Sequence, residues 1–172
     1  MRIWFTSDTH FGHAKVIPYC ERPFGSVEEM NSALTEKWNA LVDPFDLVYH
    51  LGDIAFGPYE FLRDTLKGLN GCKIVVKGNH DAEGRLKKLV KEGVIVEWHR
   101  YLDIEIDGVT VLLHHMPIFM YEPMLCGHYH REIKMERKTI NVGVDIWNMQ
   151  PVSLGTIRQL LGEANHGQKN EG

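Results

Sequence analysis

Three short apolar segments in the first half of the chain alternate with segments of helical character, and each apolar segment ends in a polar loop. Short runs of β-branched and aromatic residues with polar boundaries are typical of buried strands. These segments are residues 2–6, 47–50 and 73–77. A chain in which strands and helices alternate in this way is expected to adopt an α/β fold.

The helical segments between these strands have clear start signals. Ser26 and Glu29 form a capping box, in which the Ser26 hydroxyl accepts the Glu29 amide and the Glu29 carboxylate reaches back. Pro58 suits the first turn of a helix, because it has no amide hydrogen to leave unpaired. We expect helices at residues 26–42, 58–67 and 82–91.

The second half of the chain contains strand-like segments without long helices between them. Asp107 and Gly108 form a two-residue hairpin turn between two of these segments. Ser153 is expected to cap a final helix that ends at Leu161. A second sheet is predicted from strands at residues 94–98, 101–106, 109–113, 124–126, 133–136 and 139–142.

The chain has 172 residues, which is the size of one domain. We assign residues 1–161 to a single domain and residues 162–172, which are polar and glycine-rich, to a flexible tail. Apolar runs are far shorter than the roughly 18 residues of a membrane span, and the N-terminus lacks the apolar core of a secretory signal. The three cysteines have no Cys-x-x-Cys spacing, which argues against a disulfide framework. We expect a cytoplasmic protein without a membrane partner.

The formal net charge of the chain is -4. Basic residues are scattered except at residues 87–91 and 131–138. An acidic chain has no general attraction for a phosphate backbone, so a long nucleic acid is not the favoured partner.

Polar residues of the types that bind metals follow five of the predicted strands. Loops at strand ends are where α/β folds place their ligands. In an extended segment side chains at i and i+2 point the same way, so Asp8 with His10, and His128 with His130, can each chelate. A glycine directly before a candidate ligand permits positive φ and close approach. The five loops are Asp8-Thr9-His10, Gly52-Asp53, Gly78-Asn79-His80-Asp81, His114-His115-Met116-Pro117 and Gly127-His128-Tyr129-His130.

These motifs, in this order, resemble those of the calcineurin-like metallophosphoesterase superfamily, and the resemblance covers residue 1 to about residue 161. The opening residues 7–13 are similar to those of its small bacterial and phage members, which are predicted phosphoesterases. The resemblance implies a four-layer αββα sandwich, in which helices flank two mixed β-sheets.

The resemblance also implies a ligand set for two divalent metal ions. His114 and His115 compete for one motif, and because the superfamily's ligand lies two residues before a proline, Pro117 favours His115. His80 would lie just outside the metals as a catalytic residue. The implied ligands are Asp8, His10 and His130 for one ion, Asn79, His115 and His128 for the other, and Asp53 as a bridge.

Mixed imidazole and carboxylate ligands suit manganese, which we expect, or iron, zinc, nickel or cobalt. Two divalent ions bring four positive charges, whereas Asp8, Asp53 and a bridging hydroxide return three negative charges. This positive site would attract phosphate although the chain is acidic. We therefore expect the hydroxide to hydrolyse a phosphomonoester or phosphodiester of a small phosphorylated or nucleotide-like molecule.

Two alternative functions fit the same motifs. A nuclease or end-processing phosphatase would act on nucleic acid, and its activity on a short oligonucleotide would fall steeply with salt. A non-catalytic scaffold of the same fold would normally lack some of the ligands, and no gap is visible in this sequence. Only twelve residues separate His115 from His128, which leaves the shape of the substrate pocket open.

Several other polar residues have simpler interpretations. His50 and His99 are expected to be hydrogen-bonded core residues. His13 either contacts substrate or serves as a cap or a support for a ligand. Asp81 is expected to be the N-cap of the helix that follows it, and Cys126 is expected to pack in the core.

Overall fold

The computed structural model describes residues 1–118, 121, 123–131 and 134–167, with side chains as far as residue 163. Within these residues the chain forms a mixed α/β fold with two five-stranded sheets and five α-helices. The candidate site depends on how the loops at the ends of the two sheets meet.

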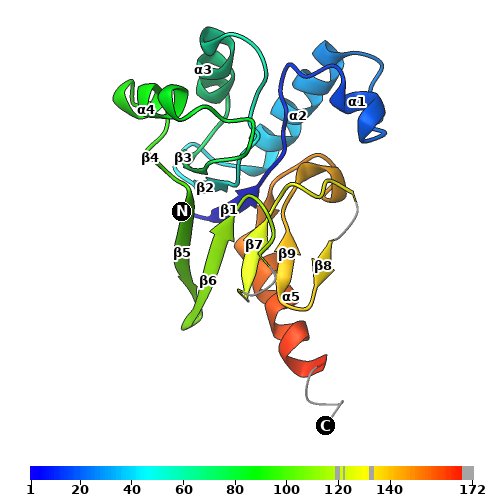
Figure 1. Ribbon diagram of the computed structural model, residues 1–172, viewed down its shortest axis with the longest axis vertical. Helices are drawn as coiled ribbons and strands as arrows, with labels where there is room; N and C mark the ends of the chain where they lie inside the picture. The colour runs from blue at the N-terminus through cyan, green and yellow to red at the C-terminus, as the bar shows by residue number, and fades with distance from the viewer. Residues whose placement is uncertain (119–120, 122, 132–133, 168–172) are drawn as a thin grey trace.

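The first sheet contains β1 (Ile3–Thr6), β2 (Leu47–His50), β3 (Cys72–Val76), β4 (Glu97–His99) and β10 (Val152–Ser153). Its strand order is β10-β1-β2-β3-β4 (Figure 1). The first four strands are parallel, and β10 joins the edge antiparallel to β1. Phe5, Val48 and Val75 are fully buried, because a parallel sheet is covered on both faces.

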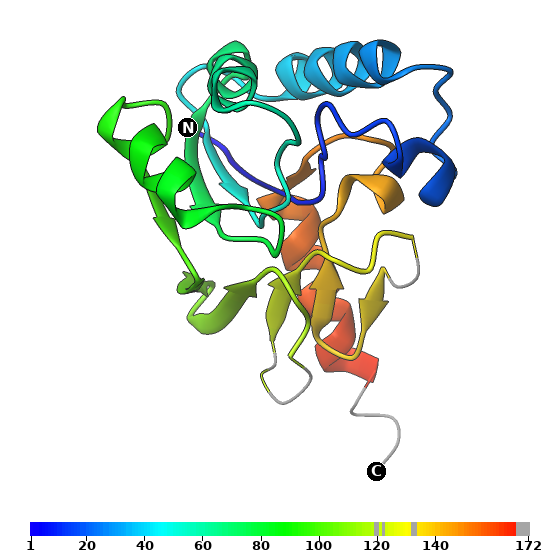
Figure 2. The same cartoon turned by 45° about the horizontal axis from the view of Figure 1, so that its top comes forward.

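Helices connect the parallel strands and cover one face of the first sheet (Figure 2). Met30, Leu34 and Trp38 recur every four residues along one helix and are buried in the same apolar cluster as Val48 and Val75. The chain therefore places an apolar helical stripe against the strands. The helices are α1 (Val16–Tyr19), α2 (Val27–Leu41), α3 (Tyr59–Gly68) and α4 (Glu83–Lys91).

The second sheet contains β5 (Tyr101–Ile106), β6 (Val109–His114), β7 (Met124–Cys126), β8 (Met135–Glu136) and β9 (Thr139–Asn141). Its strand order is β5-β6-β7-β9-β8. β5 and β6 form an antiparallel hairpin, whereas β6, β7 and β9 are parallel. A short 3₁₀ helix, η1 (Val144–Ile146), follows β9 on the way to β10.

The two sheets enclose a second apolar cluster. Phe5 and Val76 reach it from the first sheet, and Leu113 and Leu125 reach it from the second sheet. Ile157 of α5 (Leu154–Gly167) is fully buried in the same cluster. This layering agrees with the αββα sandwich that the sequence predicts.

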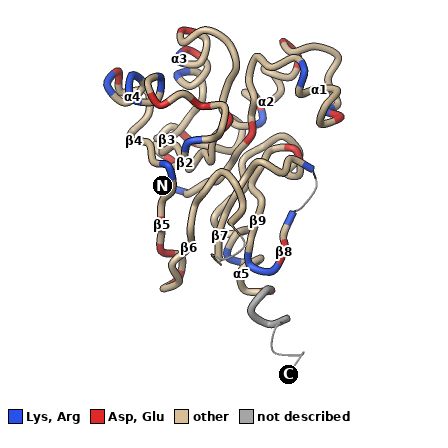
Figure 3. The backbone as a smooth tube through the Cα atoms, viewed as in Figure 1, with Lys and Arg blue, Asp and Glu red and all other residues tan. Residues whose placement is uncertain are grey.

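The helical surface carries charges of both signs. Figure 3 shows basic residues of α4 beside acidic residues on the same helix and on its neighbours. Within the part of the chain that the structure describes, no helix is both long enough and apolar enough to cross a membrane.

The predicted helix start signals at Ser26 and Ser153 are confirmed, whereas Pro58 is the N-cap of α3 and does not lie in its first turn. The Ser26 hydroxyl accepts the Glu29 amide at 3.1 Å, and the Glu29 carboxylate reaches back to the Gly25 amide at 2.7 Å. Ser153 accepts the Thr156 amide at 3.1 Å where α5 begins.

Several predicted boundaries are wrong. The strand expected at 94–98 in the second sheet is observed at Glu97–His99 and belongs to the first sheet, because it pairs parallel with β3. α5 continues to Gly167 past the expected end at Leu161. Gly162 does not end this helix, because Gln159 donates to the Glu163 carboxylate across it at 2.9 Å. β8 begins at Met135, and residue 133 of that predicted strand lies outside the described residues, as do residues 168–172 of the predicted tail.

Candidate metal centre

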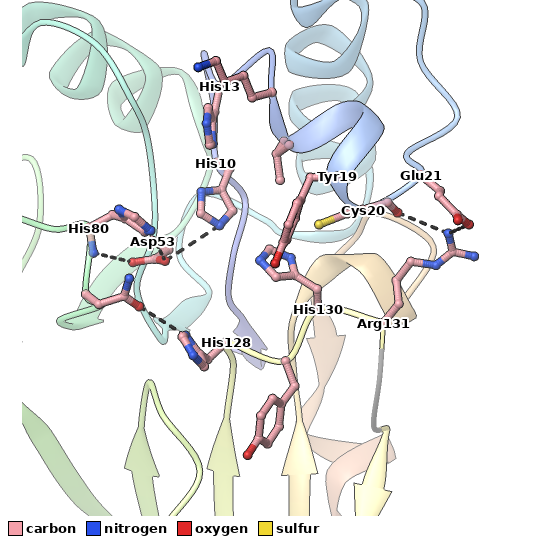
Figure 4. A pocket seen from close by; sticks show the side chains of 14 residues that line it. His10, His13, Tyr19, Cys20, Glu21, Asp53, His80, His128, His130 and Arg131 are labelled. Carbon is pink, nitrogen blue, oxygen red and sulfur yellow. Dashed lines mark hydrogen bonds and ion pairs between the residues drawn. The ribbon is translucent and has the colours of Figure 1, made fainter.

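Four of the five predicted loops line one cavity of about 870 Å³ (Figure 4). They follow β1, β2 and β3 of the first sheet and β7 of the second. The fifth loop follows β6 and lies behind the cavity wall, where His115 Nε2 is 3.5 Å from Asp53 Oδ2. The structure thereby brings together Asp8, His10, Asp53, Asn79, His80, His115, His128 and His130.

Five of these residues adopt a left-handed backbone conformation. Non-glycine residues rarely do so, and such strained residues cluster at functional sites. The extended conformation predicted for residues 8–10 is therefore wrong, although the turn still brings Asp8 Oδ1 within 3.8 Å of His10 Nε2. The φ values are 57° at Asp8, 51° at His10, 56° at Asp53, 71° at His128 and 45° at His130.

The second predicted chelating pair does not converge. Nδ1 of His128 lies 3.2 Å from Asn79 Oδ1, whereas Nδ1 of His130 lies 2.8 Å from Asp145 Oδ2. The two imidazoles therefore serve different neighbours, because the left-handed turns at both positions replace the extended backbone.

Glycines allow the loops to approach each other closely. A Cβ atom on Gly78 would overlap the backbone and carboxylate of Asp53. A Cβ atom on Gly127 would overlap Ser7 and the carboxylate of Asp8. Only glycine fits at these two positions. This explains why Gly78 and Gly127 stand directly before the polar residues of their loops.

The first ligand group consists of Asp8, His10 and His130, whose ligand atoms lie within 4.8 Å of one another. Oδ1 of Asp8 and both ring nitrogens of His10 are buried without a hydrogen-bond partner among the described residues. Burial raises the pKa of Asp8 and lowers the pKa of His10 to about 2, so His10 is a neutral imidazole at neutral pH. Asp8 and the neutral His10 therefore offer buried acceptor atoms that suit a cation.

The second group centres on His115 and Asn79. A carbonyl can only accept, so the 2.7 Å contact of His115 Nδ1 with the Leu51 carbonyl places the ring proton on Nδ1. The lone pair of Nε2 then faces Asn79 Oδ1 at 2.8 Å and Asp53 Oδ2 at 3.5 Å. By contrast, Nδ1 of His114 contacts the backbone of Met116. The structure directs His115 toward the cavity residues and His114 to its own loop.

His80 lies at the edge of these two groups. Its amide donates to Asp53 Oδ1 at 2.9 Å, and its Nε2 lies 3.9 Å from Asp53 Oδ2. The side chain is half exposed and lines the cavity. The Phe56 ring stacks on the His13 ring with centroids 4.0 Å apart, and its centroid lies 5.0 Å from that of the His80 ring. Phe56 also stacks on His10 with ring centroids 5.5 Å apart, so it contacts three histidines that line the cavity.

Sequence reasoning missed a buried pair behind His130. The Asp145 carboxylate accepts from His130 Nδ1 at 2.8 Å and from Arg22 Nε and Nη2 at 2.8 and 2.9 Å. Burial lowers the pKa of His130, but the hydrogen bonds to Asp145 and Cys20 and the nearby charge of Asp8 together outweigh it and raise the pKa to about 10. The Cys20 thiol also lies beside His130 and Asp145.

The N-cap role predicted for Asp81 is wrong. Ala82 occupies the N-cap position of α4, and the Asp81 carboxylate instead accepts the amides of Gly78, Asp53 and Ile54. Three amides from two converging loops offer more hydrogen bonds than one helix end. Asp81 therefore joins the loops after β2 and β3.

The remaining side chains divide between the core and the surface. His50 is fully buried and lies 3.0 Å from Thr9 Oγ1, as predicted for a core histidine. Cys126 is buried, and burial raises its pKa to about 12, which agrees with a packing role. His99 is only half-buried and lies 3.2 Å from the Glu97 carboxylate, so its prediction as a core residue is wrong.

Comparison with known proteins places the chain in one family. A family model described as calcineurin-like phosphoesterase matches residues 1–154. An uncharacterised protein from Methanocaldococcus jannaschii is 36% identical over 174 residues, which cover 93% of this chain and 91% of that protein. The gene 66 protein of Mycobacterium phage D29 is 27% identical over 199 residues, which cover 96% of this chain and 98% of that protein.

A solved structure shows the same architecture. The crystal structure of a protein of unknown function from Aquifex aeolicus has a TM-score of 0.72 and 28% sequence identity, and the match covers 92% of this chain and 98% of that chain. The family model spans every loop of the site described above. The chain therefore belongs to the calcineurin-like phosphoesterase family and is a metal-dependent phosphoric ester hydrolase.

Proposed function

We propose that the chain is a dinuclear metal-dependent phosphoesterase that hydrolyses a phosphomonoester or phosphodiester of a small phosphorylated or nucleotide-like molecule. The position of Asp53 between the two ligand groups carries this proposal. Its Oδ2 lies 3.8 Å from His10 Nε2 and 3.5 Å from His115 Nε2. A carboxylate within reach of both groups is suited to bridge a pair of ions.

The unpartnered atoms of the first group support cation binding. A buried polar atom without a partner costs roughly 1–3 kcal/mol, and a bound cation would remove that penalty at Asp8 and His10. Bound divalent ions in such a site supply polarisation of phosphoryl oxygens and activation of water. Mixed imidazole and carboxylate donors suit several divalent metals, of which we propose manganese, with iron, zinc, nickel and cobalt as alternatives. The residues that would hold them are Asp8, His10 and His130 on one side, Asn79, His115 and His128 on the other, and Asp53 between.

His80 is the residue that we assign to substrate chemistry. Its backbone amide is fixed to Asp53, while its half-exposed imidazole faces the cavity. An imidazolium at this place could donate to a phosphoryl oxygen or protonate the departing alkoxide. The same loop thus presents Asn79 to the ligand group and His80 to the substrate.

The size of the cavity favours a small substrate. A volume of about 870 Å³ falls in the range of roughly 300–1,000 Å³ that small-molecule sites occupy. Lys15 and Arg131 line the same cavity, and although Arg131 is paired with Glu21, the cation of Lys15 favours the end of an oligonucleotide as a second candidate substrate. Hydrolysis of a short oligonucleotide that falls steeply with added salt would support this second candidate.

Metal analysis followed by a substrate panel tests the proposal. We expect two ions per chain in the manganese-loaded protein, hydrolysis of at least one monoester or diester, and loss of this hydrolysis in chelator. The panel should be repeated with nickel, cobalt, zinc and magnesium. One ion or none per chain, together with full activity in chelator, would contradict the proposal.

A further inference from the structure

One wall of the cavity is formed by α1 and the residues beside it. Lys15 and Tyr19 are four residues apart, so they lie on the same side of this helical turn, and both line the cavity. The neighbouring residues Val16 and Cys20 are buried in the apolar core behind α1. The burial of Val16 and Cys20 therefore holds α1 in place beside the cavity.

Tyr19 presents its aromatic ring to this cavity. Its side chain extends from α1 toward His130 in Figure 4, and the residue is 82% exposed. The centroid of its ring lies 6.4 Å from the centroid of the His130 ring, with the two planes at 78°. An exposed aromatic ring on an anchored turn beside a candidate ligand offers a surface for stacking.

A contact between loops holds this wall next to the candidate ligands. Arg131 Nη1 donates to the Glu21 carboxylate at 2.6 Å and to the Cys20 carbonyl at 3.2 Å. Arg131 directly follows His130, so the contact connects the end of α1 with the loop of the second sheet. An exposed ion pair of this kind adds little stability, but it joins the end of α1 to the loop that carries His130.

We infer that Tyr19 contacts the substrate and selects phosphate esters that carry a flat aromatic group, such as a nucleobase or an aryl ring. This inference rests on the proposed function. The ring of Tyr19 contacts the ring of the candidate ligand His130. A phosphoryl group held by the ligand residues would therefore leave the organic part of the ester within reach of the Tyr19 ring. A flat ring stacks on tyrosine, whereas a puckered aliphatic ring of equal size does not.

The test is a binding measurement with non-hydrolysable phosphonates that differ only in the flatness of one ring. Isothermal calorimetry on the metal-loaded protein compares benzylphosphonate with cyclohexylmethylphosphonate. We expect the wild type to prefer the benzyl compound, and Tyr19→Ala to weaken its binding by about 5- to 150-fold, because base stacking on an aromatic side chain has this strength. Binding of the cyclohexylmethyl compound should change little, and Tyr19→Phe should retain the preference.

Matched controls separate this inference from other effects. Tyr101 is 63% exposed on β5 and does not line the cavity, so Tyr101→Ala should leave both affinities unchanged. The metal content of Tyr19→Ala should equal that of the wild type. Phosphonate analogues of thymidine 5′-phosphate and deoxyribose 5-phosphate, measured in the same way, distinguish a nucleobase from a simple aryl group.

Three outcomes would overturn the inference: no aromatic preference in the wild type, equal weakening of both ligands in Tyr19→Ala, or equal losses in Tyr19→Phe and Tyr19→Ala. The third outcome would assign the contact to the hydroxyl and not to the ring. None of these measurements requires hydrolysis. A failure of the proposed function, seen as an absence of metal-dependent hydrolysis across the ester panel, is therefore a separate result.

Discussion

At the scale of single residues, a hydrogen bond at one ring nitrogen orients each of two candidate ligands, His115 and His130. His115 donates from Nδ1 to the Leu51 carbonyl, and His130 contacts Asp145 through Nδ1. The bond at His115 leaves its Nε2 facing Asn79 and Asp53, and the bond at His130 holds its ring beside that of His10. These hydrogen bonds orient both imidazoles within the candidate site.

The adjacent histidines His114 and His115 provide a matched pair for a metal-binding test. We expect His115→Ala to lower metal content, because its Nε2 faces Asn79 and Asp53. His114→Ala should leave metal content near that of the wild type, because the polar contacts of its ring among the described residues are with the backbone of Met116. Elemental analysis of both purified variants is the measurement. The reverse pattern would show that the motif is assigned one residue out of register.

The role of His80 should appear in turnover and not in metal content. We expect His80→Ala to keep both ions and its melting temperature while kcat falls by about a hundredfold or more. The loss should be smaller for a nitrophenyl ester than for an alkyl ester, because nitrophenolate hardly needs a proton. His99→Ala on β4 is the matched control and should retain full activity. Equal losses on both esters would exclude protonation of the leaving group.

At the scale of elements, Asp46 joins the start of β1 to the start of β2. Its buried carboxylate accepts from the Arg2 amide at 2.7 Å, from the Trp4 indole at 3.0 Å and from the Asp43 amide at 3.0 Å. Burial raises the pKa of Asp46, but these hydrogen bonds together hold it well below its ordinary value of 3.8. The charged form of this carboxylate therefore stabilises the folded state.

The lowered pKa of Asp46 predicts that Asp46→Asn is less stable than the wild type and that the difference in stability depends on pH. The stabilisation is present above the unfolded-state pKa of about 3.8 and is lost as pH falls through the lower folded-state pKa. We expect the variant to melt several degrees below the wild type at pH 7, with a gap that narrows below about pH 4. Asp43→Asn, at a carboxylate that is 73% exposed, is the control and should change little. A gap that is constant with pH would contradict this account.

Elements with local signals could be predicted from the sequence, whereas those that depend on distant partners could not. Residues 47–50 form β2 as predicted, because an apolar run with polar boundaries is a local signal. β10 has two residues and exists because it pairs with β1, which lies at the other end of the chain. Asp145 is separated from Arg22 by 123 positions, so no spacing rule connects them. Asp81 has a local N-cap pattern that three distant amides override.

At the scale of the whole molecule, the candidate site lies where the two sheets meet. Asp8, Asp53 and Asn79 follow strands of the first sheet, whereas His115 and His128 follow strands of the second. Bound ions would therefore connect the sheets in addition to the apolar cluster between them. Two buried carboxylates and His10 face one another there, and Asp8 Oδ1 and both ring nitrogens of His10 have no hydrogen-bond partner among the described residues.

This arrangement predicts that chelation lowers the melting temperature as well as the activity. An ion that binds only the folded state at a hundredfold excess over its Kd adds roughly 2.7 kcal/mol. In a chain of this size, each kcal/mol shifts the melting temperature by about 2–4 °C, so one site corresponds to a shift of about 5–11 °C. Calorimetric scans of manganese-loaded protein with and without chelator measure the shift.

Calorimetric scans of an Asp53 variant test whether the stabilisation by ions comes from this site, because Asp53 lies between the two ligand groups. A neutral amide offers one carbonyl oxygen in place of two anionic oxygens, so Asp53→Asn should weaken both ions together. The melting temperature of this variant should then respond little to chelator, although its chain remains folded. Loss of only one ion would mean that Asp53 does not bridge. An unchanged melting curve of the wild type in chelator would mean that the ions do not stabilise the contact between the two sheets.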